Sequence, residues 1–299
     1  MISRTTAATS SRMMLADLSL ARQALTDAQG RISSGKAIER ASDGPADALV
    51  AIDHRASLAR SAQYDRNATD ASGWLNTADT ALVGAVDNLN RARELVLMAR
   101  NSSGDPGVRA AASAELRSIR QSLLQLSNTA YLGRPIFAGN VAGTAAYSSS
   151  GTYVGDAGAV RRPVADGIDL QVNQTGPAVF GASSATPMDG DLFQMLDAVA
   201  TAIDAGDVAA MGTSLDRIDT ATSRIEDTQV TLGARARQLE DVTARAASAD
   251  IDRRQALSQL EDVDMAEALI RVRGRQFSYE AALGIAGRTM STSLLDYLR

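Results

Sequence analysis

A mainly α-helical fold is predicted for this 299-residue sequence, with long antiparallel helices, terminal coiled-coil helices and a small β-rich inserted domain. Apolar residues recur at alternating steps of four and three near both ends of the chain, a spacing that places them on one side of a helix. Between the long helices, roughly 50 residues lose this period and are rich in Gly, Ser, Thr and Val, which is typical of short strands and turns.

The first helix is expected over residues 13–33, after a polar lead-in. Its apolar seam consists of Met14, Leu18, Ala21, Leu25, Ala28 and Ile32. Gly35 can adopt the left-handed conformation that ends a helix. The run Ser-Asp-Gly-Pro at residues 42–45 predicts a new helix, because a polar or glycine cap followed by proline is typical of a first turn.

A long second helix is expected over residues 45–100, with Leu49 and Ile52 at the start of its apolar side. Two internal glycines, Gly73 and Gly84, weaken the pattern, because glycine disfavours a helix interior.

A turn at residues 101–107 leads into a third helix, and a connection this short makes the two helices antiparallel neighbours. The helical period ends at Gly133, where the β-rich insert begins, and we expect this insert to project from the tip of the helical hairpin. Asp166-Gly167 has the sequence of a hairpin turn. Short strands are expected at residues 152–154, 160–164, 168–172 and 178–180.

The helical period returns at Asp191 with a short helix that ends at Gly206, and a long helix follows to about residue 255. Residues 258–261, Ser-Gln-Leu-Glu, have the pattern of a capping box, so the last helix is expected to start, or to follow a sharp bend, near Ser258. Its seam consists of Met265, Leu269, Val272, Tyr279, Leu283, Ala286, Met290, Leu294 and Tyr297. At about 1.5 Å per residue this helix would be on the order of 60 Å long, and its one-sided seam needs a partner helix.

We therefore expect the seams at the two ends to pair with each other and with copies of the chain. Two paired helices alone bury too little surface to offset the entropy of ordering them. The predicted division is an inner terminal domain from residues 1–44 and 258–299, a middle domain from residues 45–132 and 191–257, and a β-rich outer insert at residues 133–190.

Composition argues against several classes of protein. The net charge is −5, with 30 basic and 35 acidic residues interspersed, so neither a nucleic-acid-binding face nor a polybasic membrane signal is predicted. The sequence contains no apolar run of about 18 residues, so no transmembrane helix is predicted. The N-terminal segment lacks the apolar core of a secretory signal peptide, so any export is expected to use a route that cleaves no leader. Cysteine is absent, which excludes disulfides and thiolate sites.

Three candidate sites each have a structural explanation. His54, the only histidine, has no nucleophile motif beside it. Glycines at residues 155 and 158 lack a Walker lysine and suit tight turns. Carboxylates cluster at Glu261, Asp262, Asp264 and Glu267. This cluster lacks the turn glycine of a calcium loop, and carboxylates suit the first turn of a helix. We predict no catalytic residue, cofactor or metal site, although an enzyme that uses the insert remains an alternative.

Two motifs at mirrored ends of the chain together resemble the flagellin family. The first reads SSGKAIERASDGPA at residues 33–46, and the second reads SQLEDVDMAEA at residues 258–268. The positions that carry the resemblance are Ser34, Gly35, Lys36, Ser42, Asp43 and Pro45 in the first motif and Glu261, Asp262 and Asp264 in the second. Gly44 stands where an acidic or amide residue is more usual in the family, and glycine also caps a helix.

Three further segments resemble the branch of the family that forms the junction between the flagellar hook and filament, more than flagellin itself. They are residues 132–140, residues 153–158 together with 179–181, and residues 293–299. The resemblance covers nearly the whole chain and is weakest over residues 141–150 and 182–190.

The resemblance implies a structural, non-enzymatic component of the bacterial flagellum, exported unfolded through the flagellar type III channel and located outside the cell. It implies a ring of copies of this chain, with hook-associated protein 1 on the hook side, flagellin on the filament side and a flagellar export chaperone. No nucleic acid and no membrane insertion are expected. The alternatives are a flagellin filament subunit with a short outer domain and, more distantly, a coiled-coil signalling or adhesion protein.

Overall fold

The computed structural model describes residues 7–38, 40–101, 105–141, 143, 145–184 and 186–297, with the backbone alone at residues 7, 8, 10, 11 and 289–297. The chain divides into two compact units. Residues up to Arg60 together with those from Ala249 onward form one unit, and residues from Ser61 to Ser248 form the other.

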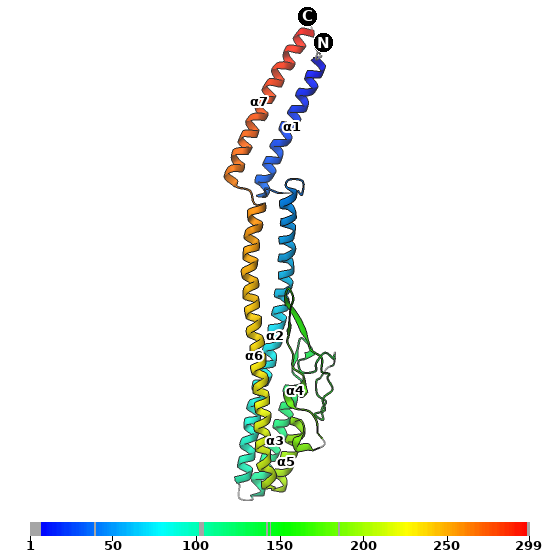
Figure 1. Ribbon diagram of the computed structural model, residues 1–299, viewed down its shortest axis with the longest axis vertical. Helices are drawn as coiled ribbons and strands as arrows, with labels where there is room; N and C mark the ends of the chain where they lie inside the picture. The colour runs from blue at the N-terminus through cyan, green and yellow to red at the C-terminus, as the bar shows by residue number, and fades with distance from the viewer. Residues whose placement is uncertain are drawn as a thin grey trace. The chain divides into compact units, whose positions relative to one another are not determined.

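Helices make up most of the described chain (Figure 1). They are α1 (Ala7–Ser34), α2 (Pro45–Asn101), α3 (Pro106–Ser127), α4 (Gly176–Phe180), α5 (Leu192–Ala205), α6 (Val208–Glu261) and α7 (Met265–Tyr297), with a 3-10 turn at Pro187–Asp189. Antiparallel pairs join β1 (Ala130–Tyr131) to β2 (Arg134–Pro135) and β3 (Arg161–Ala165) to β4 (Ile168–Gln171). The predicted fold class is confirmed. Across the described residues, no helix has the length and apolar character needed to span a bilayer.

Several predicted helix ends are confirmed. Gly35 follows the last residue of α1 with a φ of 69°, and Pro45 is the first residue of α2. Gly206 caps α5 in the left-handed conformation and donates its amide to the carbonyls of Ala202 and Ile203. The predicted start of the first helix was too late. α1 already includes Ala7, because polar residues that face solvent do not interrupt the backbone ladder of a helix.

α2 runs unbroken through both of its glycines. A Cβ atom at Gly73 would lie 2.3 Å from the hydroxyl oxygen of Tyr131, and one at Gly84 would lie 3.3 Å from Leu126. The missing side chain at Gly73 therefore lets Tyr131 pack directly against the helix. Tertiary packing explains a residue that intrinsic helix propensity disfavours.

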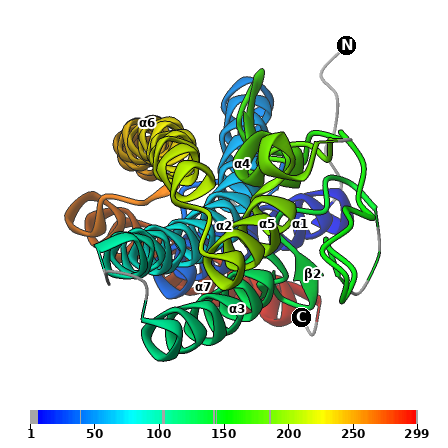
Figure 2. The ribbon, with the colours of Figure 1, turned by 90° about the horizontal axis from the view of Figure 1, so that it is seen from below.

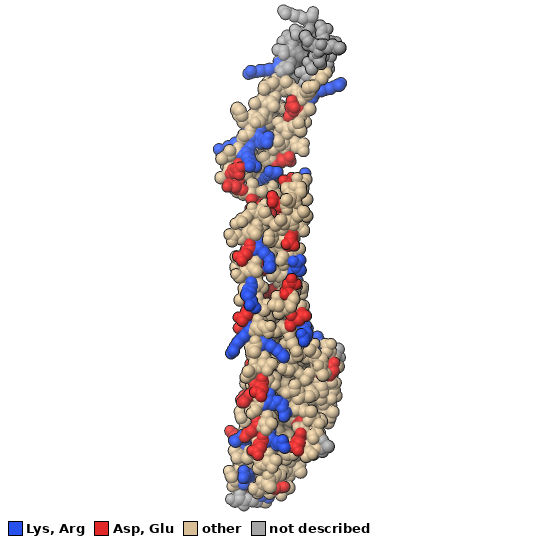
Figure 3. Space-filling view, in the orientation of Figure 1, with Lys and Arg blue, Asp and Glu red and all other residues tan. Residues whose placement is uncertain are grey.

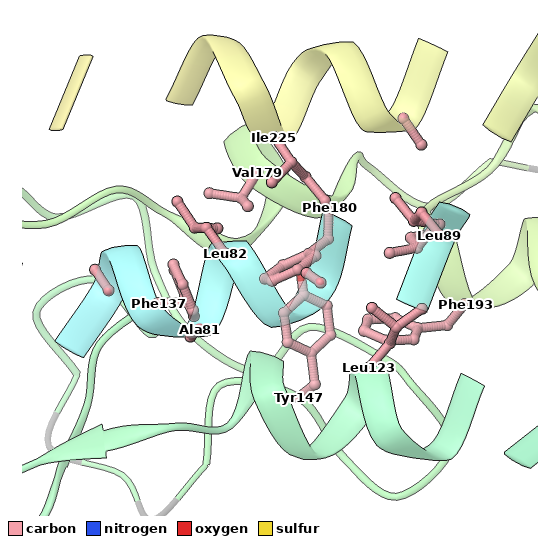
Figure 4. Packing of buried hydrophobic residues seen from close by; sticks show 14 of the residues in the cluster. Ala81, Leu82, Leu89, Leu123, Phe137, Tyr147, Val179, Phe180, Phe193 and Ile225 are labelled. Atoms are coloured by element: carbon pink, nitrogen blue, oxygen red, sulfur yellow. The ribbon is translucent and has the colours of Figure 1, made fainter. Parts of the chain in front are cut away.

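The Ser61–Ser248 unit has one hydrophobic core that its helices and the insert share. α3 packs against α5 (Figure 2). Arg91 of α2 pairs with Glu115 of α3 at 2.7 Å. Aromatic side chains from the insert and from α5 fill the space between the helices (Figure 4). Tyr147 and Phe193 have ring centroids 5.0 Å apart, and both rings are buried. The insert thus completes the core of the helices.

Two predictions for the insert need correction. Residues 178–180, predicted as a strand, belong to α4, because Pro177 presets a helical first turn and the buried Val179 and Phe180 pack into the core from that helix. Residues 152–154 contribute only an isolated bridge between Tyr153 and Tyr147. The hairpin turn at residues 166–167 is confirmed, since it joins β3 to β4 and Gly167 has a φ of 70°.

The insert also lies along α2 rather than projecting from a hairpin tip. Arg162 Nε lies 2.6 Å from Asp70 Oδ2, and Asn67 Nδ2 donates to the carbonyl of Pro163 at 2.8 Å. Trp74 of α2 and Tyr131 form an edge-on ring contact with centroids 6.0 Å apart. A segment this small cannot bury its own apolar side chains, so it uses the helix surface to do so.

The last helix starts a few residues later than predicted. α6 continues to Glu261, and α7 begins at Met265. Asp264 Oδ1 accepts hydrogen bonds from the amides of Ala266 at 2.8 Å and Glu267 at 3.2 Å, in the manner of an N-cap. Ser258 donates instead to the Asp262 carboxylate. The break between the helices is therefore at residues 262–264.

Gly73→Ala is expected to destabilise the Ser61–Ser248 unit by about 1–3 kcal/mol, because the added methyl must displace Tyr131 from α2. Urea unfolding followed through the fluorescence of Trp74, the single tryptophan, measures this change. The control is Gly233→Ala in α6, where no heavy atom lies within 4 Å of the new Cβ. It should stabilise the protein by about 0.5–1 kcal/mol through helix propensity. Equal unfolding midpoints for the two variants would contradict this account of Gly73.

Candidate functional site

The first and last long helices pair within one compact unit. α1 and α7 lie side by side (Figure 1). Every predicted seam residue of α1 is partly buried, namely Met14, Leu18, Ala21, Leu25, Ala28 and Ile32. Met13, Leu15 and Leu20 are exposed. The apolar spacing therefore marks the side of α1 that packs within a single chain, and the role of this seam in assembly stays a prediction.

On α7 the packed side is rotated from the predicted seam. The predicted seam residues on the packed side are Val272, Tyr279 and Ala286. Those that lie on an adjacent side are Met265, Leu269 and Leu283, which are exposed. The side chains of Met290, Leu294 and Tyr297 lie outside the described residues. Ala268 is buried although it is outside the predicted seam, because a short side chain lets two helices approach closely.

The chain segments at the base of this pair are joined through the backbone. The amide of Ala37 donates to the carbonyl of Glu261 at 2.6 Å, and the amide of Val263 donates to the carbonyl of Gly35 at 3.0 Å. Lys36 and Asp262 thus form an antiparallel bridge. The two family-like motifs, more than 220 residues apart in sequence, therefore meet in space.

A buried carboxylate lies at the centre of this junction. The Glu261 side chain is only 3% exposed. Its Oε1 lies 2.7 Å from Arg55 Nη2, and its Oε2 lies 3.3 Å from Lys36 Nζ. Lys36 Nζ also donates to Asp262 Oδ1 at 2.7 Å, and the Ser258 hydroxyl donates to Asp262 Oδ2 at 2.5 Å. We name Lys36, Arg55, Glu261 and Asp262 the charge latch.

The charge latch shifts the ionisation of its more exposed members. The hydrogen bond to Asp262 raises the pKa of Lys36 above its ordinary value, against a smaller opposing effect of burial. The hydrogen bonds from Lys36 and then from Ser258 lower the pKa of Asp262. Both groups are therefore held in their charged forms across the neutral range.

The remaining motif residues shape the turn that follows α1. Ser34 Oγ accepts a hydrogen bond from the Lys36 amide at 3.3 Å. Asp43 Oδ2 accepts one from the Arg40 amide at 3.0 Å, which closes the turn before α2. Ser42 is exposed in this turn, and Pro45 opens the helix.

The other candidate sites are occupied by structural contacts. The Asp264 carboxylate caps α7, and Glu267 pairs with Arg271 at 2.6 Å. In the loop at residues 155–158, Asp156 Oδ1 accepts from the amides of Asn140 at 2.7 Å and Gly158 at 2.8 Å, and these bonds lower the pKa of Asp156. The loop amides that could cradle a phosphate thus already bind a carboxylate. His54 is partly buried on α2.

An open groove of about 450 Å³ runs between α1 and α7 beside the charge latch. Its alanines are Ala24, Ala28, Ala37 and Ala268, and its charged residues include Asp27, Arg31, Glu267, Arg271 and Arg275. An open groove with both signs of charge suits contact with another protein surface better than enclosure of a small molecule. Sequence reasoning missed the groove and Arg55, since no local signal separates Arg55 from the other arginines of the long helices.

Comparison with known proteins matches residues 5–142 to the family described as the bacterial flagellin N-terminal helical region. The flagellar hook-associated protein 3 of Escherichia coli is 25% identical over 284 residues, which are 87% of this chain and 90% of that protein. A flagellin of Halalkalibacterium halodurans is 24% identical over 247 residues, covering 81% of this chain and 79% of the flagellin. The crystal structure of flagellar hook associated protein-3 from Legionella pneumophila superimposes with a TM-score of 0.60 at 18% identity. The superposition covers 69% of this chain and 98% of that one, which shows a shared fold.

Glu261→Gln is expected to loosen the junction by about 2 kcal/mol, because it removes the charge that Arg55 and Lys36 share while keeping the side-chain shape. Native-state hydrogen exchange at the amides of Ala37 and Val263 measures the loss, since both donate across the junction. Protection should fall roughly thirtyfold. The matched control, Glu267→Gln, removes an exposed pair and should leave these two amides within about twofold of the parent chain. Equal protection in both variants would contradict a central role for Glu261.

The contact between Lys36 and Asp262 should depend on pH in a defined direction. Because folding lowers the pKa of Asp262, its carboxylate stabilises the folded chain fully at pH values above 3.8, its ordinary pKa. This stabilisation is lost as the pH falls through the lower pKa of the folded state. Because folding raises the pKa of Lys36, its ammonium group stabilises the folded chain fully at pH values below 10.5, its ordinary pKa. This stabilisation is lost as the pH rises through the higher pKa of the folded state. The amide NMR shift of Val263 should therefore stay constant from pH 5 to pH 9 and change below about pH 4. Asp262→Asn should abolish the acid transition, and an unchanged transition in that variant would exclude Asp262 as its source.

Proposed function

We propose that this chain is a structural component of the bacterial flagellum and forms the junction between the hook and the filament, because residues 5–142 match the flagellin N-terminal region and its relatives include hook-associated protein 3. Its similarity to hook-associated protein 3 extends over 87% of the chain and includes both terminal segments. The role is structural rather than catalytic. In support of this, the carboxylates of the acidic cluster are engaged by cations and backbone amides, as a structural junction requires.

The observation that carries the proposal is the apolar surface of the paired terminal helices. Large apolar side chains remain exposed on both helices although one side of each is already packed. They include Leu20 on α1 and Leu269, Ile270, Phe277 and Leu283 on α7. Several large exposed apolar side chains on one helix pair are typical of a protein that is covered by partners. The terminal pair is therefore suited to assembly with neighbouring subunits.

The proposed partners follow from this assembly. Copies of the chain form a ring, hook-associated protein 1 lies on the hook side and flagellin lies on the filament side. Export without a cleaved signal peptide, with a flagellar export chaperone, would deliver the chain to the outside of the cell. Neither nucleic acid nor a membrane is a proposed partner. Figure 3 supports the first exclusion, because basic and acidic side chains are interspersed over its visible face.

In this proposal the charge latch has a positioning role. It fixes the turn after α1 and the turn before α7 to each other, and Arg55 adds the start of α2 to the same junction. The terminal seams then enter assembly from a defined starting geometry. We also propose that residues 1–44 and 258–299 form the inner part of the assembled subunit, residues 45–132 and 191–257 the middle part, and residues 133–190 the outer part.

A filament subunit is the second candidate, and the similarity to the Halalkalibacterium halodurans flagellin favours it. The deciding experiment expresses the chain in Escherichia coli that lacks its own hook-associated protein 3. A junction protein restores attached filaments and swimming, with the chain confined to the hook end of each filament by immunogold labelling. Labelling along the whole filament, or long homopolymers of the purified chain, would instead favour a filament subunit. Absence of the chain from the flagellum would overturn both.

Leu283→Asp is expected to abolish restoration of swimming while leaving the Ser61–Ser248 unit folded. Leu283 is 43% exposed in the single chain, so the new charge has little effect until a neighbouring subunit covers it. Swim diameter in soft agar and the urea midpoint from Trp74 fluorescence measure the two effects. The control is Val154→Asp, which puts the same charge at an exposed site of the insert. Normal swimming with Leu283→Asp would show that this side of α7 stays open to solvent in the assembly.

A further inference from the structure

The hairpin between β1 and β2 has a strained turn. It consists of Leu132 and Gly133 alone, and both residues have a positive φ, of 49° and 78° respectively. A two-residue turn of this kind favours Asn-Gly, because asparagine and glycine tolerate the left-handed region better than a bulky residue does. Leu132 is the one described residue other than glycine with a positive φ. Backbone strain is concentrated at functional positions, so this leucine needs a reason beyond the turn itself.

The strained residue is also exposed. Leu132 is 80% exposed, more than any other large apolar side chain in the described part of the chain. The preceding Tyr131 packs on α2 at Gly73, so the hairpin is held against the helix while its tip faces solvent. Arg134 follows the turn with its Cζ atom 5.7 Å from the centre of the Trp74 ring. None of the ion pairs of the described residues includes Arg134. We name Leu132 and Arg134 the hairpin knob, an apolar tip beside a positive charge.

An open groove of about 410 Å³ lies between α2 and α6, and we name it the α2–α6 groove. Its apolar lining includes the buried Ala68, Leu75 and Leu239. Its rim carries Asp65 and Glu240, which are exposed. None of the described residues that line the groove is basic, and neither carboxylate has an ion-pair partner in the described part of the chain. The apolar lining and negative rim complement the apolar tip and positive charge of the hairpin knob.

The hairpin and the groove lie on roughly opposite sides of α2, at the same level along the helix. The α2 residues that contact the hairpin and the insert are Asn67, Asp70, Gly73 and Trp74. The α2 residues that line the groove are Asp65, Ala68, Thr69, Ser72, Leu75 and Asn76. At about 100° per residue, the mean directions of these two sets differ by roughly half a turn. Both features belong to the compact Ser61–Ser248 unit, so the knob of one copy cannot reach the groove of the same copy.

We propose that the hairpin knob of one copy inserts Leu132 into the α2–α6 groove of a second copy, with Arg134 beside the carboxylates of the groove rim. The contact uses different surfaces on its two sides, and such head-to-tail contacts generate rings or helical assemblies. A leucine on a turn that is already fixed loses little conformational freedom on binding, which is a reason to keep leucine in this strained position. The contact rests on the proposed function, which requires copies of the chain to meet, and it lies outside the terminal helices.

Leu132→Asn separates backbone strain from binding. Asparagine relieves the left-handed turn, so the urea midpoint from Trp74 fluorescence should rise by roughly 0.5 M. The same change removes the apolar tip, so self-association in sedimentation equilibrium should weaken about tenfold. The control is Val154→Asn, at an exposed position of the insert without a positive φ, and it should change neither quantity appreciably. Unchanged association in Leu132→Asn, or no association of the parent chain at high concentration, would overturn the contact.

Glu240→Arg tests the groove side of the contact. It places a positive charge on the groove rim beside Arg134 of the second copy, so self-association should weaken about tenfold. The matched control is Asp241→Arg, which changes the net charge by the same amount at the adjacent exposed residue of α6, outside the groove lining. It should leave association within about twofold of the parent chain. Equal effects of the two variants would assign the change to net charge and overturn the contact.

A mixture of two variants tests the pairing of knob with groove. Leu132→Asn copies keep an intact groove, and Glu240→Arg copies keep an intact knob. At equal concentrations they supply one complete contact, so a mixed dimer should form with roughly the affinity of the parent chain, although each variant alone associates weakly. A mixture that associates no better than either variant alone would overturn the pairing.

The two proposals fail in different ways. A chain that restores filaments in Escherichia coli, but whose association is unaffected by Leu132→Asn and Glu240→Arg, retains the proposed function and loses this contact. A chain that associates through the knob and the groove but never joins a flagellum retains the contact and loses the proposed function.

Discussion

The buried carboxylate of Glu261 is the constraint on which the terminal unit depends. A carboxylate removed from water is stable only with cationic partners, and here they come from two distant segments, Lys36 after α1 and Arg55 on α2. The same residue accepts the Ala37 amide through its backbone carbonyl. Glu261 therefore joins three segments through one residue. Asp262 adds a more exposed contact to Lys36, whose strength is reduced by solvent and salt.

The α1–α7 pair differs in kind from the Ser61–Ser248 unit. That unit buries Trp74, Phe137, Tyr147 and other large side chains in one continuous core. The terminal pair instead uses many alanines at its contact and leaves several of its large apolar side chains outside. Burial of apolar area is the main favourable term in folding, so the first arrangement supports a unit by itself. The second leaves apolar area that only association with other chains can remove from water.

Sequence patterns predicted those features that local chemistry determines. Gly35, Pro45 and Gly206 mark helix ends because each has a conformational property that acts at its own position. The two family-like motifs predicted a functional region, and the structure brings them together at Lys36 and Asp262. The Ser-x-x-Glu run at residues 258–261 misled because Ser258 and Glu261 use their side chains on Asp262, Lys36 and Arg55 instead of capping a helix. Such long-range partners have no signature in the local sequence.

The rotated side of α7 shows why an apolar spacing can locate a helix but not its neighbour. Two adjacent sides of α7 carry leucine at positions 269 and 283 and alanine at positions 268 and 282. A prediction based on hydrophobicity selects the side with the leucines, because leucine is the more apolar residue. Contact within the chain favours the alanines, because short side chains allow closer approach over a long seam. The larger residues then remain for contacts that a single chain cannot make. For a subunit of an assembly, an apparent error in predicting the monomer core can thus identify the surface that neighbouring subunits cover.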